Sequence, residues 1–184
     1  MTKFKSYVGH NFKNFKRKRY YFQNEKNLHH DIQIIIFSFV GFTPITSQEL
    51  REAVKLWTTD ESEALKKYGH ISYWNTQNVT DMSNLFKNRQ NFNEPLNWDT
   101  KNVTNMSLMF SNAKSFNQLL NFDTKNVINM SGMFRHAISF NQPLNFDTKN
   151  VTDMSGMFFY AESFNQPLNF DTKNVTDMSG MFFY

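Results

Sequence analysis

The chain repeats itself every 24 residues along most of its length. Units that align without a gap begin at Trp74, Trp98, Phe122, Phe146 and Phe170. Four units are full, and the fifth has 15 residues. A unit of this length cannot bury its apolar side chains alone, so neighbouring units must stack and share a core. The repeat therefore predicts a solenoid.

Apolar spacing within one unit predicts a short helix and a short strand. One helical face is indicated by apolar residues at i, i+3, i+4 and i+7 of the third unit: Met130, Met133, Phe134 and Ala137. Residues 144–148 alternate between apolar and polar, as in a half-buried strand. We therefore expect an α/β solenoid, a leucine-rich-repeat-like stack of 24-residue strand, turn and short-helix coils with an N-terminal helical cap.

Polar residues recur at fixed places in the unit. One row of Asn is identical in every unit: Asn78, Asn102, Asn126, Asn150 and Asn174. A second row is Asn93, Asn117, Asn141 and Asn165. An Asn at the same place in each coil can bond the backbone of the next coil, so both rows predict structural ladders. The paired Asp123 and Lys125 recur likewise and predict adjacent rows of opposite charge.

The segment before the repeats contains two helix starts. Thr46 and Glu49 form a capping box, and a second box begins at Asp60. Gly69 suits the end of the second helix. Residues 32–42 are mostly apolar and predict a buried strand beside these helices, with a signal-peptide core as the alternative. The expected division is a basic tail at 1–31, a strand and two-helix cap at 32–73, and repeats at 74–184.

Charge is concentrated in the tail. Residues 1–31 carry eight Lys or Arg and two acids, whereas residues 32–184 have a net charge of −2. The basic run at residues 16–19 is expected to belong to a solvated, partly disordered tail, and the alternative is a contact with nucleic acid or an anionic membrane. No apolar run is long enough to predict a transmembrane helix.

Catalytic and cofactor motifs are missing from the sequence. The absence of cysteine excludes disulfides, thiolate metal sites and cysteine nucleophiles. None of the five His lies in a metal-binding or catalytic motif, and the six Gly form no phosphate-binding loop. The repeated Met residues are expected to fill the core. We therefore expect no enzyme activity, no cofactor and no metal, with weak Ca²⁺ binding by the Asp rows as a remote alternative.

The fourth unit reads NVTDMSGMF and continues into SFNQPLN. These motifs resemble the BspA-like leucine-rich-repeat surface proteins, described as bacterial surface 25/26-residue repeats and as mycoplasma lipoprotein-type repeats. The resemblance covers about residues 46–184 and implies a surface protein, in some cases an adhesin. Two departures are the 24-residue unit and the lack of a lipid-anchor cysteine. The resemblance alone implies the cell surface, and the sequence contains no clear signal peptide.

Two functions follow from these features. The first is a non-catalytic protein-interaction or adhesion-like module with an unidentified protein partner. The alternative is a structural or self-assembling scaffold without a specific ligand. The two functions differ in the role of the positions that vary between units. A specific partner would bind at these positions, which are Arg135, His136, Ile138, Phe159 and Tyr160.

The shortened fifth unit carries a separate expectation. It lacks the second half that closes each earlier coil, so its apolar end would be open. An open apolar end and an uncovered edge favour pairing with another chain. We therefore expect that the natural array is longer, with end-to-end self-association through the C-terminal coil as the next alternative and fraying of the last half-coil as the third.

Overall fold

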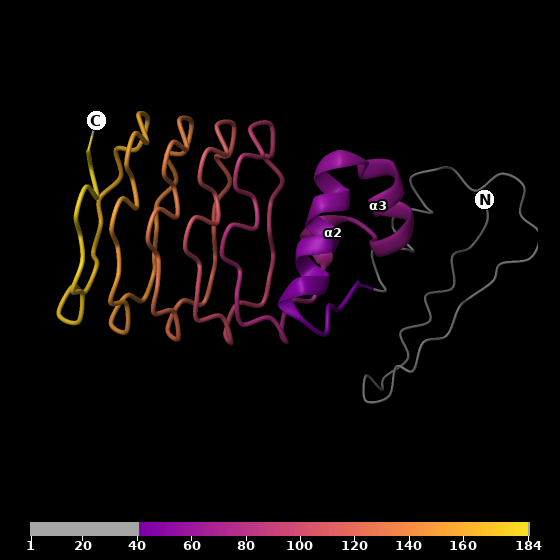
Figure 1. Cartoon of the computed structure of the whole chain (residues 1–184), viewed down its shortest axis with the longest axis horizontal. Helices are drawn as coiled ribbons and strands as arrows, with labels where there is room; N and C mark the ends of the chain where they lie inside the picture. The colour runs from indigo at the N-terminus through magenta and orange to yellow at the C-terminus, as the bar shows by residue number, and fades with distance from the viewer. Residues whose placement is uncertain (1–40, 184) are drawn as a thin grey trace, which may run out of the picture.

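The computed structural model describes residues 41–183. Helix α2 spans Ser47–Thr59, helix α3 spans Glu61–Tyr68, and the short 3-10 helix η1 spans Ile71–Tyr73. From Trp74 onward the chain runs in successive coils that lie side by side, and both helices lie at one end of this stack (Figure 1). The expected basic tail and most of the apolar segment at 32–42 fall outside the described residues.

The predicted α/β solenoid of leucine-rich-repeat-like strand, turn and helix coils is wrong. Between Trp74 and Phe183 the structure contains no helix and no strand, only turns and irregular backbone. Regular pairing is limited to isolated parallel bridges that join residues 24 apart: Asp81 to Asn105, Asn105 to Asn129, Asn129 to Asp153 and Asp153 to Asp177. The coils therefore lack the sheet and the helices that the prediction required.

Backbone geometry explains why the predicted helix does not form. Gly132 and His136 have φ angles of +58° and +54°, which no α-helical residue adopts. Every second N–H group from Met130 to His136 donates to a carbonyl of the next coil at 2.8–2.9 Å, rather than to the residue four places earlier. The N–H groups of Met133 and Arg135 close four-residue turns, for example Met133 N–H to the Met130 carbonyl at 3.2 Å. The apolar residues are fully buried, but they lie on turns.

The predicted strand fails for a different reason. Leu144, Phe146 and Thr148 are buried while Asn145 and Asp147 are exposed, so the side chains alternate as expected. Yet no backbone hydrogen bond joins Leu144–Asp147 to a neighbouring coil within the described residues. A row of buried Thr hydroxyls makes the connection instead. Each donates at 2.8–3.0 Å to the carbonyl of an Asp in the following coil, and the donors are Thr76, Thr100, Thr124 and Thr148.

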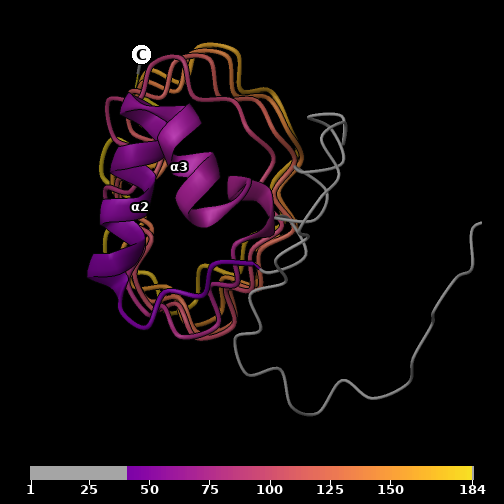
Figure 2. The same ribbon diagram turned by 90° about the vertical axis from the view of Figure 1, so that its right-hand side faces the viewer.

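Stacked phenylalanine rings fill the core. One column has ring centroids 5.4–5.7 Å apart and consists of Phe86, Phe110, Phe134, Phe158 and Phe182. A second column has 5.9 Å spacing and consists of Phe92, Phe116, Phe140 and Phe164. Successive coils lie nearly in register when viewed along the stack (Figure 2). Interplanar angles of 1–10° within both columns show that equivalent rings stack over one another. Offset stacking is a favoured aromatic arrangement, so the repeat of Phe at two positions directly stabilises the stack.

The two helices begin where the sequence indicates. The Thr46 hydroxyl accepts the Glu49 N–H at 3.1 Å, and the Glu49 carboxylate accepts the Ile45 N–H at 2.6 Å. The Asp60 carboxylate accepts the Glu63 N–H at 3.0 Å, which starts α3 directly after α2. These side chains satisfy N–H groups that a helix start leaves without partners.

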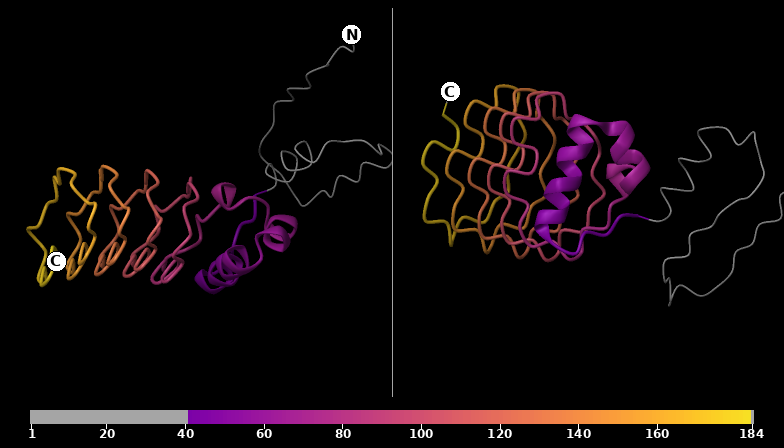
Figure 3. Two further views of the ribbon diagram at one scale, coloured as in Figure 1. Left: turned by 90° about the horizontal axis from the view of Figure 1, so that it is seen from above. Right: turned by 45° about the vertical axis from the view of Figure 1, so that its right-hand side comes forward.

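Helix α2 packs on the first coil and covers its apolar end (Figure 3). Its buried face consists of Leu50, Ala53, Val54 and Trp57. The Trp57 and Trp74 rings meet edge to face with centroids 6.0 Å apart. Arg51 reaches across, donates to the carbonyl and hydroxyl of Ser83, and pairs with the Asp81 carboxylate at 3.0 Å. Every later coil is bonded by the coil before it. The first coil has no preceding coil, and Arg51 makes these contacts instead.

Alanine at Gly132 and at Gly156 tests the left-handed turn. Both glycines have φ near +57°, so alanine strains each backbone by about 1 kcal/mol. A Cβ at Gly132 would also lie 2.6 Å from Leu108 Cδ2, whereas nothing lies within 3.8 Å at Gly156. We expect Gly156→Ala to lower the free energy of unfolding by about 1 kcal/mol in urea titrations, and Gly132→Ala by slightly more because the end of the Leu108 side chain must shift. The excess should vanish in a Leu108→Ala background, and equal costs in the parent would contradict the geometry.

The Arg51 contact predicts a pH-dependent loss of stability. Partial burial raises the pKa of the Asp81 carboxyl, but hydrogen bonds from Ser83 and the charge of Arg51 outweigh it and hold that pKa below its ordinary value. The stabilisation is therefore present above about pH 4 and is lost as the pH falls through the lower folded pKa. We expect Arg51→Ala to lower the free energy of unfolding by about 1 kcal/mol at pH 7.

Asp81→Asn is the matched variant, because Asn105 and Asn129 hold the same place in the next coils and accept the same turn N–H. Its stability deficit relative to the parent should shrink as the pH falls below about 4. A deficit that does not change with pH would show that the Asp81 charge does not stabilise the contact.

Candidate functional site

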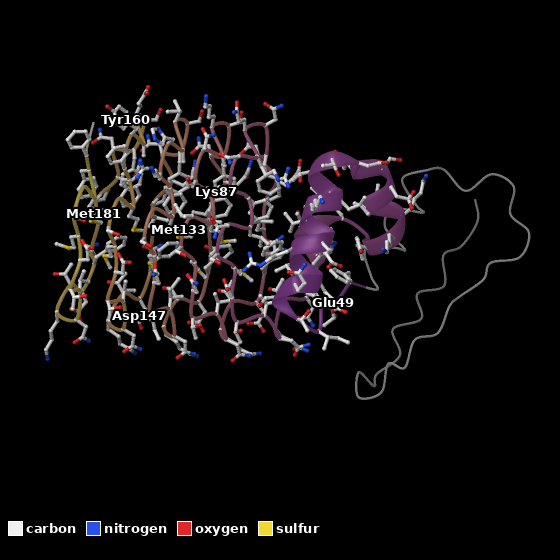
Figure 4. The ribbon with its side chains drawn as sticks, in the orientation of Figure 1. Glu49, Lys87, Met133, Asp147, Tyr160 and Met181 are labelled. Atoms are coloured by element: carbon white, nitrogen blue, oxygen red, sulfur yellow. The ribbon has the colours of Figure 1, made fainter. Side chains whose placement is uncertain are left out.

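The variable positions gather on one edge of the stack. This variable edge consists of residues 87–90, 111–114, 135–138 and 159–162. Tyr160 lies at one end of its coil and Asp147 at the other, so the variable edge and the charged Asp and Lys rows occupy opposite edges (Figure 4). The structure thus separates the positions that change between coils from those that repeat.

Four of the five predicted contact residues form a single cluster. The Arg135 guanidinium lies over the Phe159 ring, 4.1 Å from its centroid. The His136 and Tyr160 rings stack with centroids 5.2 Å apart and an interplanar angle of 12°. His136 also meets Phe159 edge to face at 5.7 Å. Ile138 is half-buried beside this cluster, and its carbonyl accepts the Ser163 N–H at 3.2 Å.

The edge places ordinary side chains in an unusual backbone conformation. One position of each coil has a φ angle of +53° to +64°, and its occupants are Asn88, Asn112, His136 and Tyr160. Asn adopts this left-handed region readily, whereas bulkier side chains do so at a cost of roughly 1 kcal/mol or more. The third and fourth coils therefore hold aromatic rings where the first two coils show that Asn suffices. Sequence reasoning missed this column, although the Asn at two of its positions was a signal for it.

The first Asn row bonds backward along the stack. Amide groups donate to a backbone carbonyl of the preceding coil at 2.6–2.8 Å from Asn102, Asn126, Asn150 and Asn174. Asn78 donates to the Pro44 carbonyl at 3.4 Å, because the helical segment precedes the first coil. The expected bond was to the next coil, so its direction is reversed. These side chains are structural and lie on the exposed surface.

The second Asn row runs in the opposite sense. The side-chain oxygens of Asn93, Asn117 and Asn141 each accept, at 2.9 Å, the backbone N–H of the equivalent Asn in the next coil. Gln142 and Gln166 add side-chain amide bonds to the same row at 3.0–3.1 Å. Both Asn rows are therefore occupied with bonds between coils.

Ion pairs within each coil neutralise the opposite edge. Lys and Asp side chains two residues apart approach to 2.8–3.3 Å in three coils: Asp99 with Lys101, Asp123 with Lys125, and Asp147 with Lys149. The hydrogen bond from the Lys101 side chain lowers the pKa of Asp99. This edge therefore repeats one balanced Asp and Lys pattern in the second, third and fourth coils, whereas the first coil has the uncharged Asn75 and Gln77 there.

A shallow groove runs along the outer face between these edges. It is lined by Asn102, Asn126 and Asn150 on one side and by Thr104, Ile128 and Thr152 on the other. Within residues 41–183, no three His, Asp or Glu side chains gather where they could hold a metal ion. No helix in that part of the chain has the length and apolar character needed to cross a membrane.

One known protein family matches the sequence of this array. The family described as "Mycoplasma protein of unknown function, DUF285" matches residues 57–145 and residues 118–184, which together cover more than half of the chain. The chain belongs to this family. No curated protein and no solved structure matches the chain. The DUF285 match begins at Trp57 in α2 and includes the whole variable edge.

The strained position predicts a difference between two replacements of Tyr160. Tyr160→Asn loses aromatic stacking, worth about 1 kcal/mol, but relieves a backbone strain of similar size. Tyr160→Val loses the same stacking and keeps the strain, since β-branched residues are poor in the left-handed region. We expect Asn to leave the free energy of unfolding within about 1 kcal/mol of the parent and Val to be about 1 kcal/mol less stable than Asn. Urea unfolding measures both, and the reverse order would show that the turn does not strain Tyr160.

Proposed function

We propose that this DUF285 protein is a non-catalytic interaction or adhesion-like module that binds a protein partner through its variable edge. We also propose that it is related to the BspA-like surface proteins, because NVTDMSGMF and SFNQPLN resemble their repeats. The supporting observation is the contrast between the two edges. The Asp and Lys edge repeats one pattern, whereas the variable edge presents Lys87, Ser111, Arg135 and Phe159 at one equivalent position.

This contrast favours specific recognition. Side chains that only hold the stack together have the same task in every coil, and the core Phe, buried Thr and ladder Asn repeat accordingly. The repeated core does not require Lys, Ser, Arg and Phe to alternate at one position, where Lys87 is exposed, Arg135 and Phe159 are partly exposed, and Ser111 is buried. A surface that differs from coil to coil can match a partner at one register only.

A scaffold without a specific ligand is the alternative. It is favoured by the Asp and Lys edge and the Asn rows, which repeat almost unchanged along the stack. Such an array would use contacts between copies, for example through the face of the last coil, where Met178 and Phe182 are 47% and 48% exposed. This proposal requires discrete oligomers of the chain.

The two proposals predict different results when residues of the variable edge are replaced. Phe159→Ser/Tyr160→Asn gives the fourth coil the residues that the second coil already has, Ser111 and Asn112. The parent, this variant and an opposite-edge control, Asp147→Ala/Lys149→Ala, are immobilised and exposed to surface extracts of the source cells. We expect a defined partner, identified by crosslinking and mass spectrometry, to bind the parent and control at least tenfold more than the edge variant.

Equal capture by all three proteins would contradict binding at the variable edge. Absence of any partner, together with discrete oligomers in light scattering, would support the scaffold instead. Circular dichroism of the three proteins serves as the folding control.

A further inference from the structure

We propose that the variable edge binds an acidic segment of a partner protein that carries an aromatic residue next to its acidic ones. This inference rests on the proposed interaction function and names the chemistry of the partner. It follows from the placement of charge and aromatic rings along the edge. The acidic residues lie against the first three coils, and the aromatic residue lies against the fourth.

Positive charge is concentrated on this edge. Its sixteen residues include Lys87, Arg89, Lys114 and Arg135 but one acid, Glu162, for a net charge of +3. Residues 32–184 as a whole have a net charge of −2, so the charge of the edge is opposite in sign to that of the rest of the array. Within residues 41–183 these four cations make no ion pair, whereas Lys101, Lys125 and Lys149 are each paired with an Asp. The edge cations are thus available to a ligand.

Arg135 is arranged to receive a carboxylate. The face of its guanidinium packs on the Phe159 ring at 4.1 Å, which fixes the side chain along the edge. Stacking of this kind leaves the N–H groups at the rim of the guanidinium, where they bind carboxylates in pairs. Lys114 in the adjoining coil is exposed and adds a second cation.

Aromatic rings continue the edge beyond the cations. Tyr160 is 37% exposed and stacks on His136, and Phe159 is partly exposed beside it. The Phe159 ring is already contacted by Arg135 and stacks with Phe183, so a planar side chain of the ligand would pack on the exposed Tyr160 ring. The left-handed backbone at His136 and Tyr160 supports a binding role for these rings, because Asn holds the same position at lower strain in the first two coils.

The length of the edge fits a short extended peptide. Coils paired through backbone bonds lie about 4.8 Å apart, so the first and fourth coils are separated by about 14 Å. An extended chain covers this distance in about four residues, at roughly 3.3 Å for each. A single-stranded nucleic acid fits less well, because Glu162 stands next to the rings and would repel the phosphate that accompanies each base.

Fluorescence anisotropy of the full chain with the labelled peptide Glu-Asp-Glu-Asp-Gly-Tyr-Phe tests the proposal. Residues 1–31 have a net charge of +6 and could bind the peptide by themselves, so the result depends on edge variants. Lys114→Glu/Arg135→Gln should weaken binding about tenfold or more. Lys101→Glu/Lys125→Gln removes the same charge from the opposite edge and should change binding less than about twofold.

The ring contact is tested separately with Phe159→Ser/Tyr160→Asn. This variant keeps the edge charge and should also weaken binding about tenfold, while a peptide with Ala in place of its Tyr and Phe should bind the parent equally weakly. Added salt should weaken binding of the acidic peptide.

Three results would overturn the proposal. They are no measurable binding to the parent, equal weakening by the two charge variants, and displacement of the peptide by an oligothymidylate that binds the edge more tightly. If one of these occurs while extract capture still depends on Phe159 and Tyr160, the partner chemistry is wrong and the interaction function stands. If that capture also fails, the interaction function is wrong as well.

Discussion

Backbone hydrogen bonds between successive coils are the interaction on which the structure depends. Every second N–H group from Met130 to His136 bonds the next coil, and the same pattern occurs at Met82 to Asn88. Because these donors point along the stack, one coil cannot satisfy them alone. Repetition every 24 residues is the means by which each coil presents matching carbonyls to its neighbour. The first coil has only the helical segment before it, and Arg51 of α2 bonds Ser83 there.

The same bonding pattern determines the shape of the variable edge. To aim alternate N–H groups along the stack, the chain passes twice per coil through positive φ angles, as at Gly132 and His136. The first position is occupied by Asn84 and Leu108 in the first two coils and by Gly, which this conformation favours, in the last three. The second ends with Tyr160, a residue that the conformation does not favour. The exposed cluster of rings thus stands on a turn that the stack itself requires.

The two edges divide structural and recognition properties between them. Lys and Asp pairs on one edge cancel their charges within the second, third and fourth coils, so stacking there does not bring like charges together without partners. Arg135, by contrast, contacts a ring in the next coil rather than an acid. Arg135 has no ion-pair partner within residues 41–183 and is partly exposed, so the edge combines positive charge with aromatic surface. A polar ladder on one side and an unpaired cationic edge on the other give this DUF285 chain a single distinctive face.

Several properties were determined by the sequence alone. The 24-residue period, the inward-facing Met130, Met133, Phe134 and Ala137, and the helix starts at Thr46 and Asp60 all follow from local spacing and side-chain chemistry. The secondary structure of the coil did not, because i, i+3, i+4, i+7 spacing fits a run of tight turns as well as a helix. Left-handed Gly132 and the carbonyls of the next coil select the turns, and both require neighbours in three dimensions. Tertiary structure likewise decided the direction of the Asn102 bond and the contact of Arg135 with Phe159, since each joins residues from different coils.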